Sequence, residues 1–327
     1  MKRLLLACLF CMFVVMPFVG TSAMAAGNYP VKPISVIIPS EAGSDGDIAA
    51  RPFLEKLSKI LGKPVLPINK PGGGQTIGYG EIYTAKPDGY TLGLAYASML
   101  TAKMQGLFPY DHHDFTILGT YLVQYPLIYA STKTKNPFKT FQELITYAKA
   151  HPKEVKFAST ARGGIFWNTA MVVQEMTGVK FNIIPQAGSA GFVVTQVAGG
   201  HADVGAGGFT AAKPQVDAGN IRLIATAGPE HFKGKYSSIP TLKDLGYNAS
   251  IVTGSTLIGP PKMPKDVVEK LIKAAEIAAK DPEYQAFIES RYDIPKYMNP
   301  QEYLAFADEQ VKLLRKIFEE AGLLKEK

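Results

Sequence analysis

Two glycine-rich segments near the start of the chain contain the residues whose types and spacing best fit a chemical role. Residues 39–51 read PSEAGSDGDIAAR and residues 69–78 read NKPGGGQTIG. Glycines here allow a tight turn into a helix, and the first N–H groups of a helix have no partner within it. Those groups, at the positive end of the helix dipole, favour an anion such as a carboxylate. The alternative is that these glycines only make short turns.

The flanking residues place both segments between a strand and a helix. The first follows the apolar run 34–39 and precedes apolar residues at helical spacing that end at Gly62. The second follows 65–68 and leads into a helix over 77–85. In open α/β sheets, ligands bind at the carboxyl ends of the strands. Both segments are therefore expected at that edge.

Two acidic residues lie inside the first segment, where they should repel an anion. We hypothesise that Asp47 caps its helix or pairs with Arg51, with its carboxylate turned away from the ligand.

Sequence motifs for catalysis are not found. The glycines at 72, 73, 74 and 78 lack dinucleotide-binding spacing, and neither a Gly-Lys-Ser/Thr phosphate loop nor a Gly-x-Ser-x-Gly elbow occurs. The five histidines show no metal-ligand spacing, and the adjacent His112 and His113 are expected to diverge. We expect a protein that is not an enzyme and that has no cofactor and no metal.

The first 25 residues have the layout of a cleaved secretory signal peptide: Lys2 and Arg3, an apolar stretch over 4–19, and small residues ending at Ala25. Both cysteines, Cys8 and Cys11, lie within it, so a disulfide or a catalytic thiol is not expected in the mature chain. No later run approaches the roughly 20 apolar residues of a membrane span. The sequence predicts a periplasmic protein.

Composition limits the remaining classes. With 327 residues, 46% of them hydrophobic and 19% charged, the chain suits one or two packed domains. Removing Lys2 and Arg3 lowers the formal net charge from +7 to +5, and the remaining basic residues form no tract. We therefore expect neither nucleic-acid binding nor membrane insertion.

The alternation of strands and helices in the first part of the chain recurs in the middle. We expect an α/β fold with two lobes, lobe 1 from 26–128 plus 256–327 and lobe 2 from 129–255, with crossovers near 126–131 and 251–258. A cleft between the lobes would face the glycine loops.

A series of short motifs resembles the Bug-type solute-binding proteins of tripartite tricarboxylate transporters. The opening Tyr29, Pro30, Lys32, Pro33, Ile34 is similar, as are the two glycine loops. In family order follow Lys86 to Leu92, Tyr110-Asp111, Asp114 to Thr116, Gly199-Gly200-His201 with Asp203, Ala218-Gly219 with Arg222, Ile239 to Thr241, and Leu245 to Tyr247. The resemblance covers essentially the whole mature chain.

The resemblance implies a two-lobed periplasmic binding protein of type II, or Venus flytrap: each lobe a mixed sheet flanked by helices, with the ligand cleft between them. It implies a monomer that binds a small organic acid and delivers it to a permease of one large and one small membrane subunit. In lobe 1 it implies contacts from Ala42, Gly43, Ser44, Asp45, Gly46, Asp47, Gly74, Gln75, Thr76 and Ile77. In lobe 2 the expected site residues are Ser159, Thr160, Arg162, Gly163, Gly164, Trp167, Gln186, Gly188 and Gly207.

Several of these positions depart from the family pattern. Gln75 replaces a usual glycine, Gln186 stands where tyrosine is usual, and Gly207 where an acidic residue is common. Arg162 could form a bidentate pair with a second carboxylate, or it could be a solvated loop residue. Of Phe166 and Trp167, at most one should reach the cleft, and the other should pack in the core.

Three functions remain open from the sequence: transport of a carboxylate, presentation of a carboxylate to a membrane sensor, and, least supported, catalysis by an α/β enzyme. The acid itself also remains open between aliphatic and aromatic, with Arg162 favouring a dicarboxylate.

Overall fold

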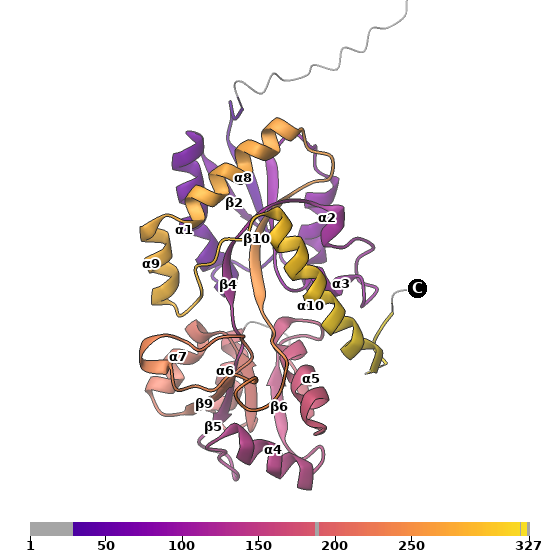
Figure 1. The fold of residues 1–327 in the computed structure, drawn as a ribbon, viewed down its shortest axis with the longest axis vertical. Helices are drawn as coiled ribbons and strands as arrows, with labels where there is room; N and C mark the ends of the chain where they lie inside the picture. Colours follow the sequence, from indigo (N-terminus) through magenta and orange to yellow (C-terminus); the bar gives the residue numbers. More distant parts are fainter. Residues whose placement is uncertain (1–28, 187–189, 321, 326–327) are drawn as a thin grey trace, which may run out of the picture.

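The computed structural model describes residues 29–186, 190–320 and 322–325. The predicted signal peptide and Gly188 lie outside these ranges. Two five-stranded sheets, each flanked by helices, form two lobes placed end to end (Figure 1). The predicted two-lobed α/β fold is confirmed, whereas the residue boundaries of the lobes remain a proposal.

Lobe 1 is built on a sheet with strand order β2–β1–β3–β10–β4. Strands β1, β2 and β3 are parallel, and β10 runs antiparallel between β3 and β4. The strands are β1 (Ile34–Ile38), β2 (Val65–Asn69), β3 (Thr91–Ala95), β4 (Thr116–Gln124) and β10 (Thr253–Gly259). The helices are α1 (Asp45–Leu61), η2 (Gly73–Gln75), α2 (Thr76–Thr84), α3 (Met99–Ala102), η3 (His112–Asp114), α8 (Lys265–Ala279) and α9 (Pro282–Ser290).

Lobe 2 repeats this pattern with the strand order β7–β6–β8–β5–β9. Strands β6, β7 and β8 are parallel, and β5 runs antiparallel between β8 and β9. The strands are β5 (Leu127–Ser131), β6 (Lys156–Ser159), β7 (Asn182–Pro185), β8 (Val204–Gly207) and β9 (Ile221–Thr226). The helices are α4 (Phe141–Ala150), α5 (Ile165–Thr177), α6 (Ala190–Ala198), α7 (Phe209–Asp217) and η4 (Gly234–Tyr236).

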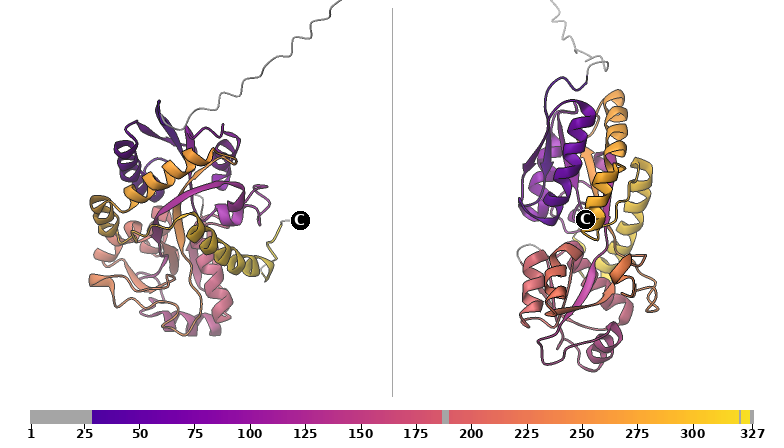
Figure 2. Two further views of the ribbon diagram at one scale, coloured as in Figure 1. Left: turned by 45° about the horizontal axis from the view of Figure 1, so that its top comes forward. Right: turned by 90° about the vertical axis from the view of Figure 1, so that its left-hand side faces the viewer.

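The chain passes from the first sheet to the second between β4 and β5, and it returns through β10. The last helix, α10 (Pro300–Glu320), contacts β4 and α3 in lobe 1 and α5 in lobe 2. It lies along the side of the molecule beside both lobes (Figure 2). Of the described helices, none is long and apolar enough to span a bilayer.

Local signals set the helix ends, including the predicted end at Gly62. The side chain of Asp281 accepts from the N–H of Tyr284 and caps α9, and Asn299 and Glu302 satisfy each other's N–H groups at the start of α10. Gly62 ends α1 in a left-handed conformation, with φ +68°.

Gly78 allows α2 to lie close to the loop that follows β1. A Cβ at this position would lie 2.6 Å from Pro39 Cβ, 3.0 Å from Pro39 Cα and 3.1 Å from the carbonyl oxygen of Lys70. Because two of these atoms belong to the backbone, they cannot move aside as a side-chain tip would.

Gly78→Ala is therefore expected to lower the free energy of unfolding by about 1–3 kcal/mol, the usual cost of overpacking. Gly80, two residues further along α2, has open space around its Cα. Gly80→Ala should raise the free energy of unfolding by about 0.5–1 kcal/mol, because alanine is the better helix former. Urea denaturation of both variants tests the pair, and equal effects would contradict the packing argument.

Candidate functional site

Helices begin where the parallel strands end, three in each lobe. In lobe 1, α1, α2 and α3 follow β1, β2 and β3; in lobe 2, α5, α6 and α7 follow β6, β7 and β8. The helix N-termini therefore lie along one edge of each sheet. The edges meet where Thr101 Oγ1 of α3 donates a buried hydrogen bond of 2.9 Å to the carbonyl of Gly163. The predicted ligand loops thus lie at the junction between the lobes.

Ser44 and Asp47 hold the first glycine loop in shape. Ser44 is the N-cap of α1, and its hydroxyl accepts from the N–H of Asp47 at 3.3 Å. The carboxylate of Asp47 accepts from the N–H of Gly43 at 2.9 Å. Asp45 and Gly46 occupy the first helical positions, whose N–H groups have no acceptor within the helix.

The carboxylate of Asp47 is neutralised inside lobe 1. Its side chain is only 2% exposed, and it accepts from Arg51 Nε at 3.0 Å, from Arg51 Nη2 at 2.9 Å and from Asn69 Nδ2 at 3.0 Å. Burial alone would raise the pKa of Asp47, but the hydrogen bonds from Arg51, Gly43 and Asn69 lower it below its ordinary value. The hypothesis that Asp47 pairs with Arg51 is confirmed.

Asp45 also has an arginine partner, one that is distant in the sequence and was not predicted from it. Arg291, in the segment after α9, places Nη2 3.5 Å from Asp45 Oδ1 and Nε 3.3 Å from Asp293 Oδ2. Burial raises the pKa of Asp45, and it raises the pKa of the more deeply buried Asp293 to about 6, although Arg291 opposes both shifts. One guanidinium therefore lies between two carboxylates.

Asp45 also reaches the start of α7 in lobe 2. A Cβ at Gly208, the N-cap of α7, would lie 3.3 Å from Asp45 Oδ2 and 3.9 Å from Cζ of Phe166. The absence of a side chain at 208 is what lets the two lobes approach at this point.

The second glycine loop is shaped by Gln75, which has φ +81°, a left-handed conformation in which glycine is favoured. Its side chain accepts from Tyr79 OH at 3.0 Å and from the hydroxyl of Ser98, and these bonds hold it against lobe 1. Thr76 and Ile77 begin α2, and Gly74 lies beside Leu107. Ile77 and Leu107 are 57% and 53% exposed, so the rim of this loop is apolar.

The loop after β6 carries the predicted lobe 2 residues. Ser159 is buried, and its hydroxyl donates to the carbonyl of Thr160. The carbonyl of Gly163 accepts from Asn168 at 3.1 Å as well as from Thr101, and Gly164 is the N-cap of α5. Arg162 is exposed at the tip of this loop.

Trp167 lies in a buried cluster with Met104, Leu314 and Phe318, and its ring meets that of Phe318 edge to face at 5.7 Å. It is 4% exposed. Trp167 therefore packs against α10, and its contact with a ligand stays a prediction. Phe166, the neighbouring aromatic residue, is the one that approaches Gly208 and Asp45.

Two further predicted residues lie at the ends of lobe 2 strands. Gln186 directly follows β7, and its N–H donates to the carbonyl of Ser159 at 2.8 Å. Gly207 is buried at the end of β8, where a Cβ would lie 2.8 Å from Tyr129 OH. Gly207 therefore makes room for the tyrosine ring.

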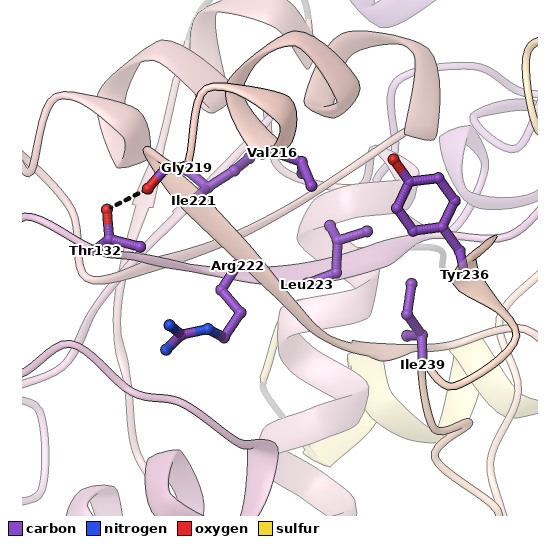
Figure 3. Close-up of a pocket in the computed structure, with 8 residues that line it drawn as sticks. All are labelled: Thr132, Val216, Gly219, Ile221, Arg222, Leu223, Tyr236 and Ile239. Atoms are coloured by element: carbon purple, nitrogen blue, oxygen red, sulfur yellow. Dashed lines mark hydrogen bonds between the residues drawn. The ribbon is translucent and has the colours of Figure 1, made fainter.

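Two pockets lie away from the predicted ligand loops. One, of about 340 Å³, is lined by Thr132, Val216, Gly219, Ile221, Arg222, Leu223, Tyr236 and Ile239 at the β9 edge of lobe 2 (Figure 3). A second, of about 650 Å³, lies along α4. Neither of these two pockets is lined by a residue of the predicted ligand loops.

The expectation that His112 and His113 diverge is wrong. In the short helix η3 both Nε2 atoms approach the same oxygen, Asp308 Oδ1, at 2.9 Å and 2.8 Å. The prediction assumed the geometry of a long regular element, whereas η3 is a single turn facing α10.

Comparison with known proteins identifies relatives over most of the chain. Residues 49–323 match the model of the family described as tripartite tricarboxylate transporter family receptor. A UPF0065 protein of Cupriavidus necator is 32% identical over 315 residues, 94% of each chain, and the protein BugT of Bordetella pertussis is 29% identical over 252 residues, 75% of this chain and 76% of that one. The structure of a periplasmic transporter superposes with a TM-score of 0.80 at 27% identity, covering 90% of this chain and 99% of that one. An R. palustris protein with adipate has the same fold, with a TM-score of 0.80 at 20% identity and the same coverage.

Asp47→Asn removes the charge that pairs with Arg51 but keeps the shape of the side chain. We expect it to lower the free energy of unfolding by about 2 kcal/mol at pH 7, as for other buried hydrogen bonds to charged groups. Because the pKa of Asp47 is lower in the folded state than in the unfolded one, this stabilisation is present above about pH 4. It should disappear as the pH falls further.

Urea denaturation of both proteins between pH 3 and pH 8 measures this difference. Glu55→Gln is the matched control, because Glu55 makes an exposed pair with Lys59 on the same helix, and its removal should leave the free energy of unfolding unchanged. Equal stability of Asp47→Asn and wild type at pH 7 would contradict the bracing role.

Proposed function

Because this chain belongs to the tripartite tricarboxylate transporter receptor family, we propose that it binds a small dicarboxylate between its two lobes and delivers it to the membrane permease of such a transporter. The chain is a solute-binding receptor of that family, and its relatives include a periplasmic transporter. We place its work in the periplasm, after removal of the predicted signal peptide. The ligand, the contacts and the permease are the proposed parts.

The pairing of both loop carboxylates with arginine supports an anionic ligand. Asp47 is held by Arg51 and Asp45 by Arg291. The charge of Asp47 is therefore compensated, and that of Asp45 is offset by an arginine that it shares with Asp293, while the N–H groups at the starts of α1 and α2 retain their positive potential. An anionic group is the ligand that these N–H groups bind best.

Micromolar affinity requires contacts from both lobes. One helix N-terminus contributes about 0.3–1 kcal/mol to an anion, or about 2 kcal/mol in a shielded place. Micromolar affinity needs about 8 kcal/mol. We propose that residues 42–47 and 74–77 bind one carboxylate and that the loop 159–164 binds the other, with Arg162 supplying a bidentate contact.

Apolar side chains on the first helical turns favour a hydrocarbon spacer between the two carboxylates. Ile48 in α1, Ile77 in α2 and Phe192 in α6 are 39%, 57% and 44% exposed. A solute with methylene groups would cover part of this surface. Adipate, which the R. palustris protein of this fold holds, has that chemistry and is the first probe.

Arg162→Gln is expected to weaken binding of adipate by about 10- to 100-fold, the loss of one or two charge-assisted hydrogen bonds. Isothermal titration calorimetry of the chain lacking residues 1–25 with adipate, hexanoate and citrate measures these dissociation constants. Hexanoate, which has one carboxylate, should bind both proteins equally.

Arg222→Gln provides the control, because Arg222 is an exposed arginine of the same lobe that lines the pocket in Figure 3, away from the loops. It should bind adipate like wild type. Unchanged binding of adipate by Arg162→Gln would contradict the proposed role of Arg162. The proposed ligand class would be wrong if no carboxylate bound wild type or raised its melting temperature.

A further inference from the structure

His112, His113 and Asp308 form a compact cluster on the outside of lobe 1. The Nε2 atoms of the two histidines lie 2.9 Å and 2.8 Å from Asp308 Oδ1, and the two rings are 4.3 Å apart. All three potential ligand atoms lie within 4.8 Å of one another. The residues come from η3 and α10, which are nearly 200 positions apart in the sequence.

Both elements are fixed by contacts outside the cluster. Asp111 and Asp114 form a capping box around η3, and Lys103 binds the Asp111 carboxylate at 2.8 Å. Helix α10 is held against β4 and α3 by buried residues such as Tyr303 and Ala307. The three side chains are therefore presented by a rigid frame.

We propose that His112, His113 and Asp308 bind one divalent transition-metal ion, with Zn²⁺ as the representative ion. Two imidazole nitrogens and one carboxylate oxygen form a common ligand set for this metal class. In a tetrahedral zinc site with bonds of about 2.0–2.1 Å, ligand atoms stand about 3.3 Å apart. The nitrogens and the oxygen need to separate by only about half an ångström to admit the ion.

The exposure of the cluster gives the ion an entry path and leaves room for a water ligand. His113 and Asp308 are each 54% exposed, whereas His112 is 3% exposed. When Nε2 of His112 binds metal, its proton resides on Nδ1, which is buried with no hydrogen-bond partner among the described residues. We therefore expect an affinity of about micromolar and not the tighter binding of sites whose second nitrogen is hydrogen-bonded.

Bound metal would join η3 to α10, the helix that contacts both lobes. It should therefore raise the melting temperature, because it binds the folded chain and not the unfolded one. This rise in melting temperature does not depend on the carboxylate ligand. An experiment can therefore disprove the metal site without contradicting the proposed transport function.

The test uses the chain without a polyhistidine tag, after treatment with EDTA. Titration with ZnCl₂ by calorimetry should show one ion per chain, and Co²⁺ should give the visible absorption of a low-coordinate site. His113→Ala and Asp308→Asn, both at exposed positions, should each lose at least tenfold in affinity and should lose the Zn²⁺-dependent rise in melting temperature.

His231→Ala is the matched control, because His231 pairs with Asp244 at 3.1 Å and has no second histidine beside it in the described structure. It should bind Zn²⁺ like wild type. The proposal is overturned if wild type binds no Zn²⁺ at 100 µM, about 100 times the expected dissociation constant. It is also overturned if His113→Ala and Asp308→Asn bind as tightly as His231→Ala.

Discussion

Charge neutralisation inside the first glycine loop determines which groups the start of α1 can offer to a ligand. A helix N-terminus attracts negative charge from any source, including the protein's own aspartates. Here Asp47 takes the N–H of Gly43 and is itself held by Arg51 and Asn69. The loop is braced by an internal anion, and the N–H groups of Asp45 and Gly46 at the start of α1 have no acceptor within the helix.

The repeated sheet topology explains why the helix N-termini of lobe 2 face those of lobe 1. Both lobes use three parallel strands followed by an antiparallel strand that belongs to a crossing segment, β10 in lobe 1 and β5 in lobe 2. Parallel strands force every following helix to begin at the same edge, and the short crossings keep the two edges together. The bond from Thr101 to Gly163 marks where they meet.

Interactions between residues close in the chain could be predicted from the sequence, whereas those between distant residues could not. A helix end such as Gly62 acts within four residues, so the sequence predicted it correctly, and the alternation of elements indicated two α/β lobes. Arg291 and Asp45 are 246 positions apart, and only the folded chain brings them together. Trp167 and Phe318 are a similar case, because the apolar stripe of α10 predicts burial but not its partner.

The segment after α9 shows how motion between the lobes can be limited. Tyr292, with φ +59°, stacks on Phe209 of α7 at 4.1 Å, and the carbonyl of Arg291 accepts from Thr210 of the same helix. Asp293 accepts from Gln124, the last residue of β4 before the crossing. The segment after α9 is thus attached to α7 of lobe 2 by aromatic packing and by a hydrogen bond from a side chain to the backbone. At the predicted ligand loops, the glycines at 163 and 208 let residues of the two lobes lie close together. Under the proposed function, a solute bound between those loops would add contacts to both lobes, and its binding energy would favour the arrangement in which the lobes lie close together.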